Sequence, residues 1–172
     1  EISKKLSNDI EEMEKMLNEY LQFASSNSSE KTEKFNLSNL LETTIKNYEK
    51  NEILSDITQS IYIDGRKNLI KRCFNNLIDN SIKYSDNIFI NLIKKTNNII
   101  ITIDDDGPGI PENERENVFK PFYKMNKSRG DSKSSVGLGL SIASDIIKSH
   151  GGNIVLENSP SNGLRAKIFL PF

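Results

Sequence analysis

The stretch NNLIDNSIKYS, residues 75–85, ends a longer segment, 65–85, in which apolar residues recur with a helical period. Asn76, Asn80 and Lys83 stand four and three positions apart, so they share one face of that helix. An Asn amide oxygen can ligate Mg²⁺, and a nearby Lys can neutralise a phosphate. A polar stripe is more often a solvated face, so this pattern alone does not define a site.

Two glycine-containing segments further along the chain also suit a nucleotide. In DDDGPGI, 104–110, a carboxylate at a strand end can accept a hydrogen bond from an exocyclic amine such as that of adenine. The two glycines that follow let the backbone approach a flat ligand without a Cβ clash. In VGLGL, 136–140, glycines precede a helix whose first N–H groups would face a phosphate. An Asp-Gly turn and a loop hinge are the ordinary alternatives.

The remaining pattern predicts helices on one side of a mainly antiparallel sheet, which is an α/β two-layer sandwich. Ser38 is the expected N-cap of the first of its helices. The apolar runs 87–95 and 97–105 predict a hairpin. Helices are predicted at 37–50, 65–85, 111–119 and 138–150, and the other strands at 53–57, 60–64, 152–158 and 164–172.

Residues 1–25 predict one amphipathic helix that precedes this domain. Such a helix cannot bury its apolar stripe alone and needs a partner helix or a dimer mate. Residues 26–34 contain no apolar residue and predict a linker, so the globular domain is expected over 35–172. The stripe consists of Ile2, Leu6, Ile10, Met13, Leu17, Tyr20 and Ala24.

Composition excludes several classes of protein. Lys and Arg number 23 against 24 Asp and Glu, which argues against a nucleic-acid binder. No apolar run approaches the ~18 residues of a membrane span, and the first residues lack the apolar core of a signal peptide. The single cysteine, Cys73, excludes an intrachain disulfide and is expected to be buried. The chain does not begin with Met, so we expect it to be an excerpt of a longer protein.

Taken together, the order and spacing of these motifs resemble the catalytic domain of sensor histidine kinases, a member of the GHKL ATPase superfamily. The resemblance covers residues 35–172, and its finer match is to osmosensor-type kinases of Gram-negative bacteria. Residues 12–24 also resemble the second helix of the family's dimerisation and phosphotransfer hairpin. The matching motifs are NNLIDNSIKYS for the N box, DDDGPGI for the G1 box, VFKPFYK for the F box, VGLGLSIA for the G2 box and GLRAKIFLP for the strand after the G3 box.

The resemblance implies a Bergerat-type sandwich that binds ATP and Mg²⁺ between the N-box helix and a mobile lid, residues 123–136. It implies that Asn80 is the principal Mg²⁺ ligand and Asn76 a supporting one. Lys83 would contact phosphate, so that these three residues form the catalytic set. Asp105 would bind the adenine amine. The other implied nucleotide contacts are Tyr84, Gly107, Gly109, Ile110, Phe122, Gly137, Leu138, Gly139 and Leu140, and Phe119 would join Phe122 at the base of the lid.

Two departures from the family pattern concern the lid and the G3 box. Ser135 stands where the family often has the first glycine of Gly-x-Gly-Leu-Gly-Leu, which would stiffen the lid or weaken nucleotide binding. The G3 region keeps Gly163 but lacks the usual second glycine and the Thr or Ser after it.

The chain has one histidine, His150, with no carboxylate beside it to accept its proton. Its place at a helix end before Gly-Gly predicts a capping role, favoured by cationic character. The family transfers the γ-phosphate of ATP to a His on the first hairpin helix, so we expect that His upstream of Glu1. The resemblance further implies relay to the receiver domain of a response regulator and homodimerisation through the hairpin. It implies the cytoplasmic domain of an inner-membrane bacterial sensor, joined to the membrane only through upstream segments.

Three alternatives share parts of this pattern. Gyrase, mismatch-repair and Hsp90-type ATPases resemble one another in placing a water-activating Glu at the position of Asn76. This chain lacks that Glu, so its hydrolysis of ATP should be slow. A degenerate nucleotide-binding module conflicts with the presence of Asn80, Asp105 and the glycines. A Ser/Thr kinase of the anti-sigma type would not be expected to carry the 1–25 helix.

Overall fold

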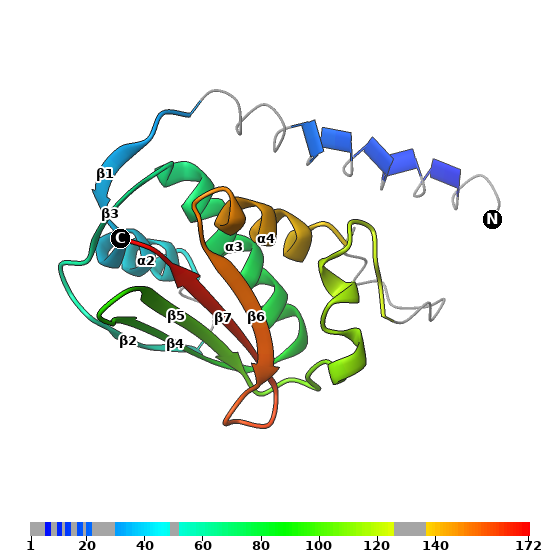
Figure 1. Cartoon of the computed structure of the whole chain (residues 1–172). Helices are drawn as coiled ribbons and strands as arrows, with labels where there is room; N and C mark the ends of the chain where they lie inside the picture. Colours follow the sequence, from blue (N-terminus) through cyan, green and yellow to red (C-terminus); the bar gives the residue numbers. More distant parts are fainter. Residues whose placement is uncertain are drawn as a thin grey trace.

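The computed structural model describes residues 6–7, 10–11, 13–14, 17–18, 20–21, 30–48, 52–125 and 137–172. The elements are β1 (Glu33–Asn36), α2 (Leu37–Lys46), β2 (Glu52–Ile57), β3 (Tyr62–Gly65), α3 (Lys67–Tyr84), β4 (Asn87–Lys94), β5 (Ile99–Asp105), η1 (Glu112–Glu114), η2 (Asn117–Phe119), α4 (Gly139–Lys148), β6 (Asn153–Asn158) and β7 (Leu164–Leu170). The helices α2, α3 and α4 cover one face of a five-stranded sheet (Figure 1).

This sheet has the strand order β2-β4-β5-β7-β6. The pair β2–β4 is parallel, whereas β4–β5, β5–β7 and β6–β7 are antiparallel. The predicted hairpin forms, because β4 and β5 pair along their length. A separate two-stranded sheet joins β1 to β3. The expected α/β two-layer sandwich with a mostly antiparallel sheet is confirmed.

The core lies between the sheet and the helices, and period-two alternation along the strands sets it. In β4, Ile88, Ile90 and Leu92 are buried, while Phe89 between them is exposed on the uncovered face. Cys73 of α3 is fully buried, as expected, and burial raises the pKa of its thiol.

The N-cap of α2 is Asn36 rather than Ser38, which corrects the sequence-based assignment. The Asn36 side chain accepts a hydrogen bond from the backbone N–H of Asn39 at 2.9 Å. Ser38 is buried in the first turn, two residues later, where its hydroxyl donates to the Thr58 carbonyl at 2.7 Å and accepts from the Ile61 N–H at 3.1 Å. Ser38 therefore joins α2 to the chain between β2 and β3.

The segment predicted as a linker is attached to the domain at its C-terminal end. Glu33 already belongs to β1, and Glu30 accepts hydrogen bonds from the backbone N–H groups of Asn68 at 2.7 Å and Leu69 at 3.1 Å. These are first-turn amides of α3, whose own N-cap, Arg66, makes no side-chain cap bond. A carboxylate there satisfies free N–H groups and interacts favourably with the helix dipole.

His150 caps the C-terminal end of α4, as expected, but the ring is neutral rather than cationic. Its Nδ1–H donates to the Ile146 carbonyl at 2.7 Å, and its Nε2 accepts from the backbone N–H of Arg66 at 3.0 Å. A protonated Nε2 could not accept that bond. Burial holds the pKa of His150 below its usual value, and the hydrogen bond to the Ile146 carbonyl opposes this only in part. The charges of Arg66 and Glu30 make smaller contributions of opposite sign.

We expect this histidine to make the fold less stable at mildly acidic pH. Because the folded-state pKa is lowered, the unfolded chain binds a proton first as pH falls through ~6.5, and stability falls with it. The decrease should be less than about 1 kcal/mol per pH unit, since solvent screens a half-buried ring. Urea unfolding at several pH values between 7.5 and 5 should show a steeper decline for the wild type than for His150→Gln. Equal slopes would contradict a neutral His150.

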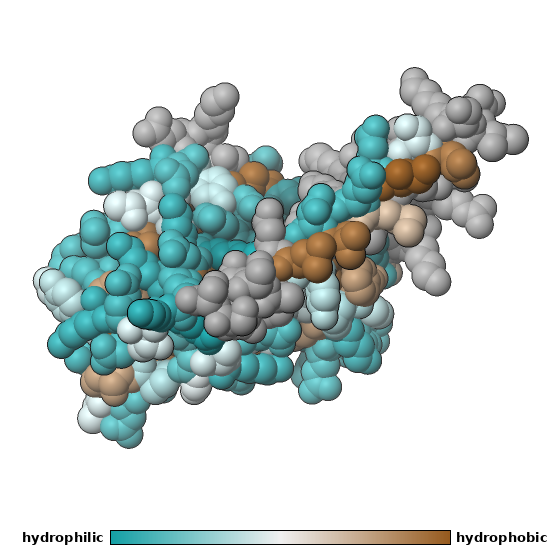
Figure 2. All heavy atoms as spheres, turned by 90° about the horizontal axis from the view of Figure 1, so that it is seen from above, coloured by the Kyte–Doolittle hydropathy of each residue, from teal (hydrophilic) through white to brown (hydrophobic). Residues whose placement is uncertain are grey.

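The described residues of the N-terminal segment are helical and expose their apolar side chains. Figure 2 shows these side chains as a brown row on the arm at the upper right. Within the part of the chain that the structure describes, no helix is both long and apolar enough to cross a membrane. Ile2 and Ala24 lie outside the described residues. The exposed fractions lie between 51% and 67% for Leu6, Ile10, Met13, Leu17, Tyr20 and Leu21.

Candidate functional site

The polar face of α3 meets the beginning of α4. Asn76, Asn80 and Lys83 are all half-buried, while the opposite face of α3 packs into the core. A Cβ placed on Gly139 would lie 4.0 Å from the Cβ of Asn76, so the first turn of α4 sits against the middle of that polar face. The structure therefore brings the predicted N-box and G2-box residues together.

The side chain of Asn76 leaves a donor unsatisfied at this junction. Its Nδ2 is buried and has no hydrogen-bond partner, alone among the buried side-chain nitrogen and oxygen atoms of the described residues. A buried polar group without a partner costs about 1–3 kcal/mol, so such a group is best explained by a ligand. The amide can present its nitrogen to a phosphate oxygen or, turned over, its oxygen to a cation. The junction thus fits a nucleotide phosphate with its metal ion.

The N-terminus of α4 supplies backbone donors at the same place. Its N-cap, Leu138, makes no side-chain cap bond, and first-turn N–H groups have no partner within their own helix. Gly137 precedes it with φ +78°, and a Cβ there would come within 2.9 Å of the Tyr123 carbonyl oxygen. Leu138 is only 2% exposed and belongs to the core, so its side chain does not contact a ligand. Leu140 is half-buried in the first turn.

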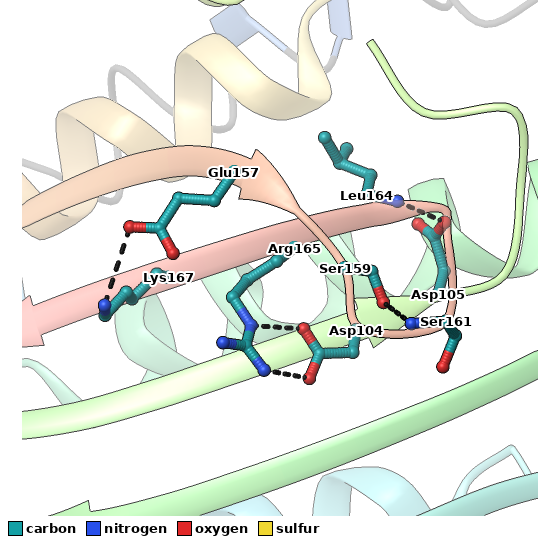
Figure 3. A network of polar contacts seen from close by, with 8 residues as sticks. All are labelled: Asp104, Asp105, Glu157, Ser159, Ser161, Leu164, Arg165 and Lys167. Carbon is teal, nitrogen blue, oxygen red and sulfur yellow. Dashed lines mark hydrogen bonds and ion pairs between the residues drawn. The ribbon is translucent and has the colours of Figure 1, made fainter.

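The three consecutive aspartates at the end of β5 have three different roles. Asp104 accepts two hydrogen bonds from Arg165, at 2.6 and 2.7 Å (Figure 3). Asp106 accepts from the backbone N–H and side-chain amide of Asn87, and these bonds lower the pKa of its carboxyl. Asp105 alone faces the glycine loop. It is 4% exposed, and its Oδ1 accepts hydrogen bonds from the backbone N–H groups of Gly107 and Leu164. Its Oδ2 can therefore accept a hydrogen bond from a ligand.

The loop beside Asp105 is built by close backbone contacts that only glycine permits. A Cβ on Gly107 would lie 2.7 Å from the Tyr84 carbonyl oxygen, at the end of α3. A Cβ on Gly163 would lie 2.2 Å from the Asp105 carbonyl oxygen. Gly163 was recognised only as half of a G3 box, yet it lets the β6–β7 turn reach the aspartate. The Tyr84 ring is exposed, and the Lys83 ammonium lies 5.0 Å from its centroid.

The region of the F box differs from the prediction, and its two phenylalanines have different environments. Instead of the single short helix predicted at 111–119, this region forms the two 3₁₀ turns η1 and η2. Phe119 packs against the core, but the Phe122 side chain is 57% exposed, and its φ is +63°. The Phe122 N–H donates to the Gly137 carbonyl at 3.0 Å, which joins the two ends of the predicted lid. Lid residues 126–136, including Ser135, lie outside the described residues.

Comparison with known proteins agrees with this geometry. Residues 65–172 match the model of the family described as histidine kinase-, DNA gyrase B-, and HSP90-like ATPases. The chain belongs to this family, and within it to the catalytic, ATP-binding domains of sensor histidine kinases. The two-layer sandwich and the resemblance to these kinases are thereby confirmed, while the osmosensor type stays a prediction.

Two curated relatives and two solved structures illustrate the match. Sensor histidine kinase GtrS of Pseudomonas aeruginosa is 33% identical over 141 residues, which are 74% of this chain and 29% of the relative. Sensor histidine kinase CpxA of Escherichia coli is 37% identical over 108 residues, 62% of this chain and 24% of the relative. The chain therefore spans less than a third of the length of these relatives.

The catalytic domain of histidine kinase ThkA has a TM-score of 0.73 and 26% identity, covering 82% of this chain and 95% of that one. Full-length ShkA, solved in complex with AMPPNP, has a TM-score of 0.75 and 18% identity, covering 92% of this chain and 35% of that one. The second likeness bears on the fold alone.

Proposed function

We propose that this chain is the ATP-dependent catalytic part of a two-component sensor kinase, which transfers the γ-phosphate of ATP to a histidine on a hairpin helix outside this chain. The observation that carries the proposal is the junction of α3 and α4. There Asn76 Nδ2 is buried without a partner among the described residues, directly beside the first turn of α4.

The proposal includes a task for each residue of the site. Asn80, with Asn76 in support, would hold Mg²⁺, which when bound supplies neutralisation of the charge on the phosphates. Lys83 and the first-turn N–H groups of α4 bind the phosphate oxygens. Asp105 Oδ2 accepts from the adenine amine and orients the base. Gly107, Gly109 and Ile110 line the pocket beside it.

The acceptor of the phosphoryl group should be a protein side chain rather than water. Position 76, where related ATPases carry a Glu, holds an amide that cannot take a proton from water. Transfer then depends on positioning an external nucleophile in line with the γ-phosphate. His150 is unsuited to that role, because both of its ring nitrogens are engaged in capping contacts.

The wider organisation follows from the exposed stripe of the N-terminal helix. We propose that residues 1–25 form the second helix of the dimerisation and phosphotransfer hairpin, 26–34 the linker, and 35–172 the catalytic domain. The exposed apolar side chains of the stripe support a homodimer. The partners would be the receiver domain of a response regulator and the chain's own hairpin. The domain would lie on the cytoplasmic side of a bacterial inner membrane.

The test is a transfer reaction in two parts. The chain is mixed with Mg²⁺, ATP labelled at the γ-position and a separate hairpin that carries the acceptor His of the parent protein. We expect acid-labile label on the hairpin and none on the chain. Transfer should be slow, since cutting the tether removes its effective concentration.

Two outcomes would contradict this proposal. Label on the chain itself, lost in His150→Ala, would make His150 an acceptor. Absence of label on either partner, despite measurable ATP binding, would favour a degenerate nucleotide-binding module.

A further inference from the structure

A cleft of about 440 Å³ lies behind the glycine loop, on the side of the β6–β7 turn. One wall is the chain 108–112, and the other is formed by Asn158, Asn162 and Gly163. Arg115 also lines this cleft. None of the motifs that point to a nucleotide includes Arg115, Asn158 or Asn162.

Arg115 links the two walls with two hydrogen bonds from one guanidinium group. Its Nε donates to the Ile110 carbonyl at 3.1 Å, where the glycine loop ends. Its Nη2 donates to Asn158 Oδ1 at 2.5 Å, at the last residue of β6. The guanidinium presents its N–H groups in a planar array of fixed geometry, so one side chain can hold two acceptors at a set separation.

This link complements a second one on the other side of the glycine loop. Asp105 Oδ1 accepts from the Leu164 N–H at 2.9 Å, which holds the start of β7 against the end of β5 (Figure 3). Between the two links, a Cβ on Gly109 would lie 3.5 Å from the Gly163 carbonyl oxygen. The loop that is proposed to face adenine is thus backed by the β6–β7 turn and tied to it at each end.

We propose that Arg115 is a positioning residue for the adenine half of the site. It does not touch the nucleotide; it holds Ile110 and the glycine loop at the distance from Asp105 that the base requires. This inference rests on the proposed function, because it presupposes that adenine lies against Asp105. Loss of this link should therefore loosen the glycine loop, where the base would bind. It should leave the phosphate-binding junction of α3 and α4 unchanged.

The test compares a ligand that has the base with one that lacks it. Calorimetry would measure the affinities of the full chain for ATP and for inorganic tripolyphosphate, each with Mg²⁺. In Arg115→Met, which keeps the aliphatic stem, we expect ATP affinity to fall by about fivefold to tenfold, as for a partly exposed charged hydrogen bond. Tripolyphosphate affinity should not change. In the transfer reaction, KM for ATP should rise while kcat stays the same.

Asn158 gives a second, independent variant in case Arg115→Met disturbs folding. Asn158→Ala removes only the acceptor and should also weaken ATP binding, whereas Asn158→Asp keeps an acceptor and should retain it. The double variant with Arg115→Met should be no worse than the worse single one, because both remove the same link. Lys167→Met is the matched control, since it removes a cation paired with Glu157 on the uncovered face of the sheet.

The remaining outcomes distinguish a failure of the role of Arg115 from a failure of the proposed function. Unchanged ATP affinity in Arg115→Met and Asn158→Ala would overturn the positioning role of Arg115 but not the proposed function. Equal losses for ATP and tripolyphosphate would show a general structural effect and would overturn it too. Failure of the wild-type chain to bind ATP would instead overturn the proposed function itself.

Discussion

Asn80→Ala should abolish phosphoryl transfer while weakening ATP binding much less. Asn80 lies one turn beyond Asn76 on α3, so the two side chains share the polar face of that helix. The role proposed for it is to hold the ion that neutralises charge on the phosphates, and this charge grows as the γ-phosphate leaves. Several kcal/mol of such stabilisation corresponds to a rate lower by about a thousandfold.

Two assays check this expectation in a protein that also carries the acceptor hairpin. Single-turnover transfer from labelled ATP gives the rate, and calorimetry gives the affinity, which should fall by less than about tenfold. Asn75→Ala is the matched control, because Asn75 precedes Asn76 on α3 but accepts a hydrogen bond from Tyr48 at 3.3 Å. Wild-type transfer rates in Asn80→Ala would show that Asn80 does not hold the ion.

Asp105→Asn should lower ATP affinity by about tenfold to a hundredfold. The Asn oxygen can still accept from the N–H groups of Gly107 and Leu164, so the glycine loop should keep its shape. At the position of Oδ2, however, the amide presents an N–H₂ group to the adenine amine, and two donors then oppose each other. Loss of a charge-assisted hydrogen bond costs about 1.5–3 kcal/mol, which corresponds to this range of affinities.

The neighbouring aspartate supplies the control for this prediction. Asp106→Asn removes the same charge one residue later, where the carboxylate is exposed and binds the start of β4. Its ATP affinity should equal that of the wild type. A calorimetric titration in which Asp105→Asn also matched the wild type would remove Asp105 from the site.

Local patterns were sufficient for the three long helices and for the strands of the five-stranded sheet, but not for β1 or for the two 3₁₀ turns. Apolar runs predicted β4, β5, β6 and β7, and the spacing of Asn76, Asn80 and Lys83 placed them on one helix face. These predictions hold because each depends on neighbours within about one turn or one strand. Asn36 and Ser38 are both suitable N-cap residues for α2. Ser38 is buried and hydrogen-bonded to Ile61, so Asn36 is the residue that caps the helix.

Long-range contacts were beyond the reach of the same patterns. The carboxylate of Glu30 binds backbone amides 38 and 39 residues away. The polar sequence around Glu30 predicted only a linker. His150 was predicted to be cationic because a helix C-terminus favours a cation. The ring is neutral because the Arg66 N–H, brought to it by folding, requires an acceptor.

The sequence by itself determined the family, the order of elements and the residue types of the candidate site, because motif spacing and hydrophobic period are properties of the chain. The G1-box resemblance already singled out Asp105, but only the tertiary structure decided how Asp104 and Asp106 are bound, and that Gly163 and Arg115 support the glycine loop. Asp104, Asp105 and Asp106 are chemically identical, and their roles differ because Arg165 and Leu164 of β7 bind the first two, while Asn87 at the start of β4 binds the third. These hydrogen bonds depend on the order and register of the strands in the sheet, which no local sequence pattern encodes.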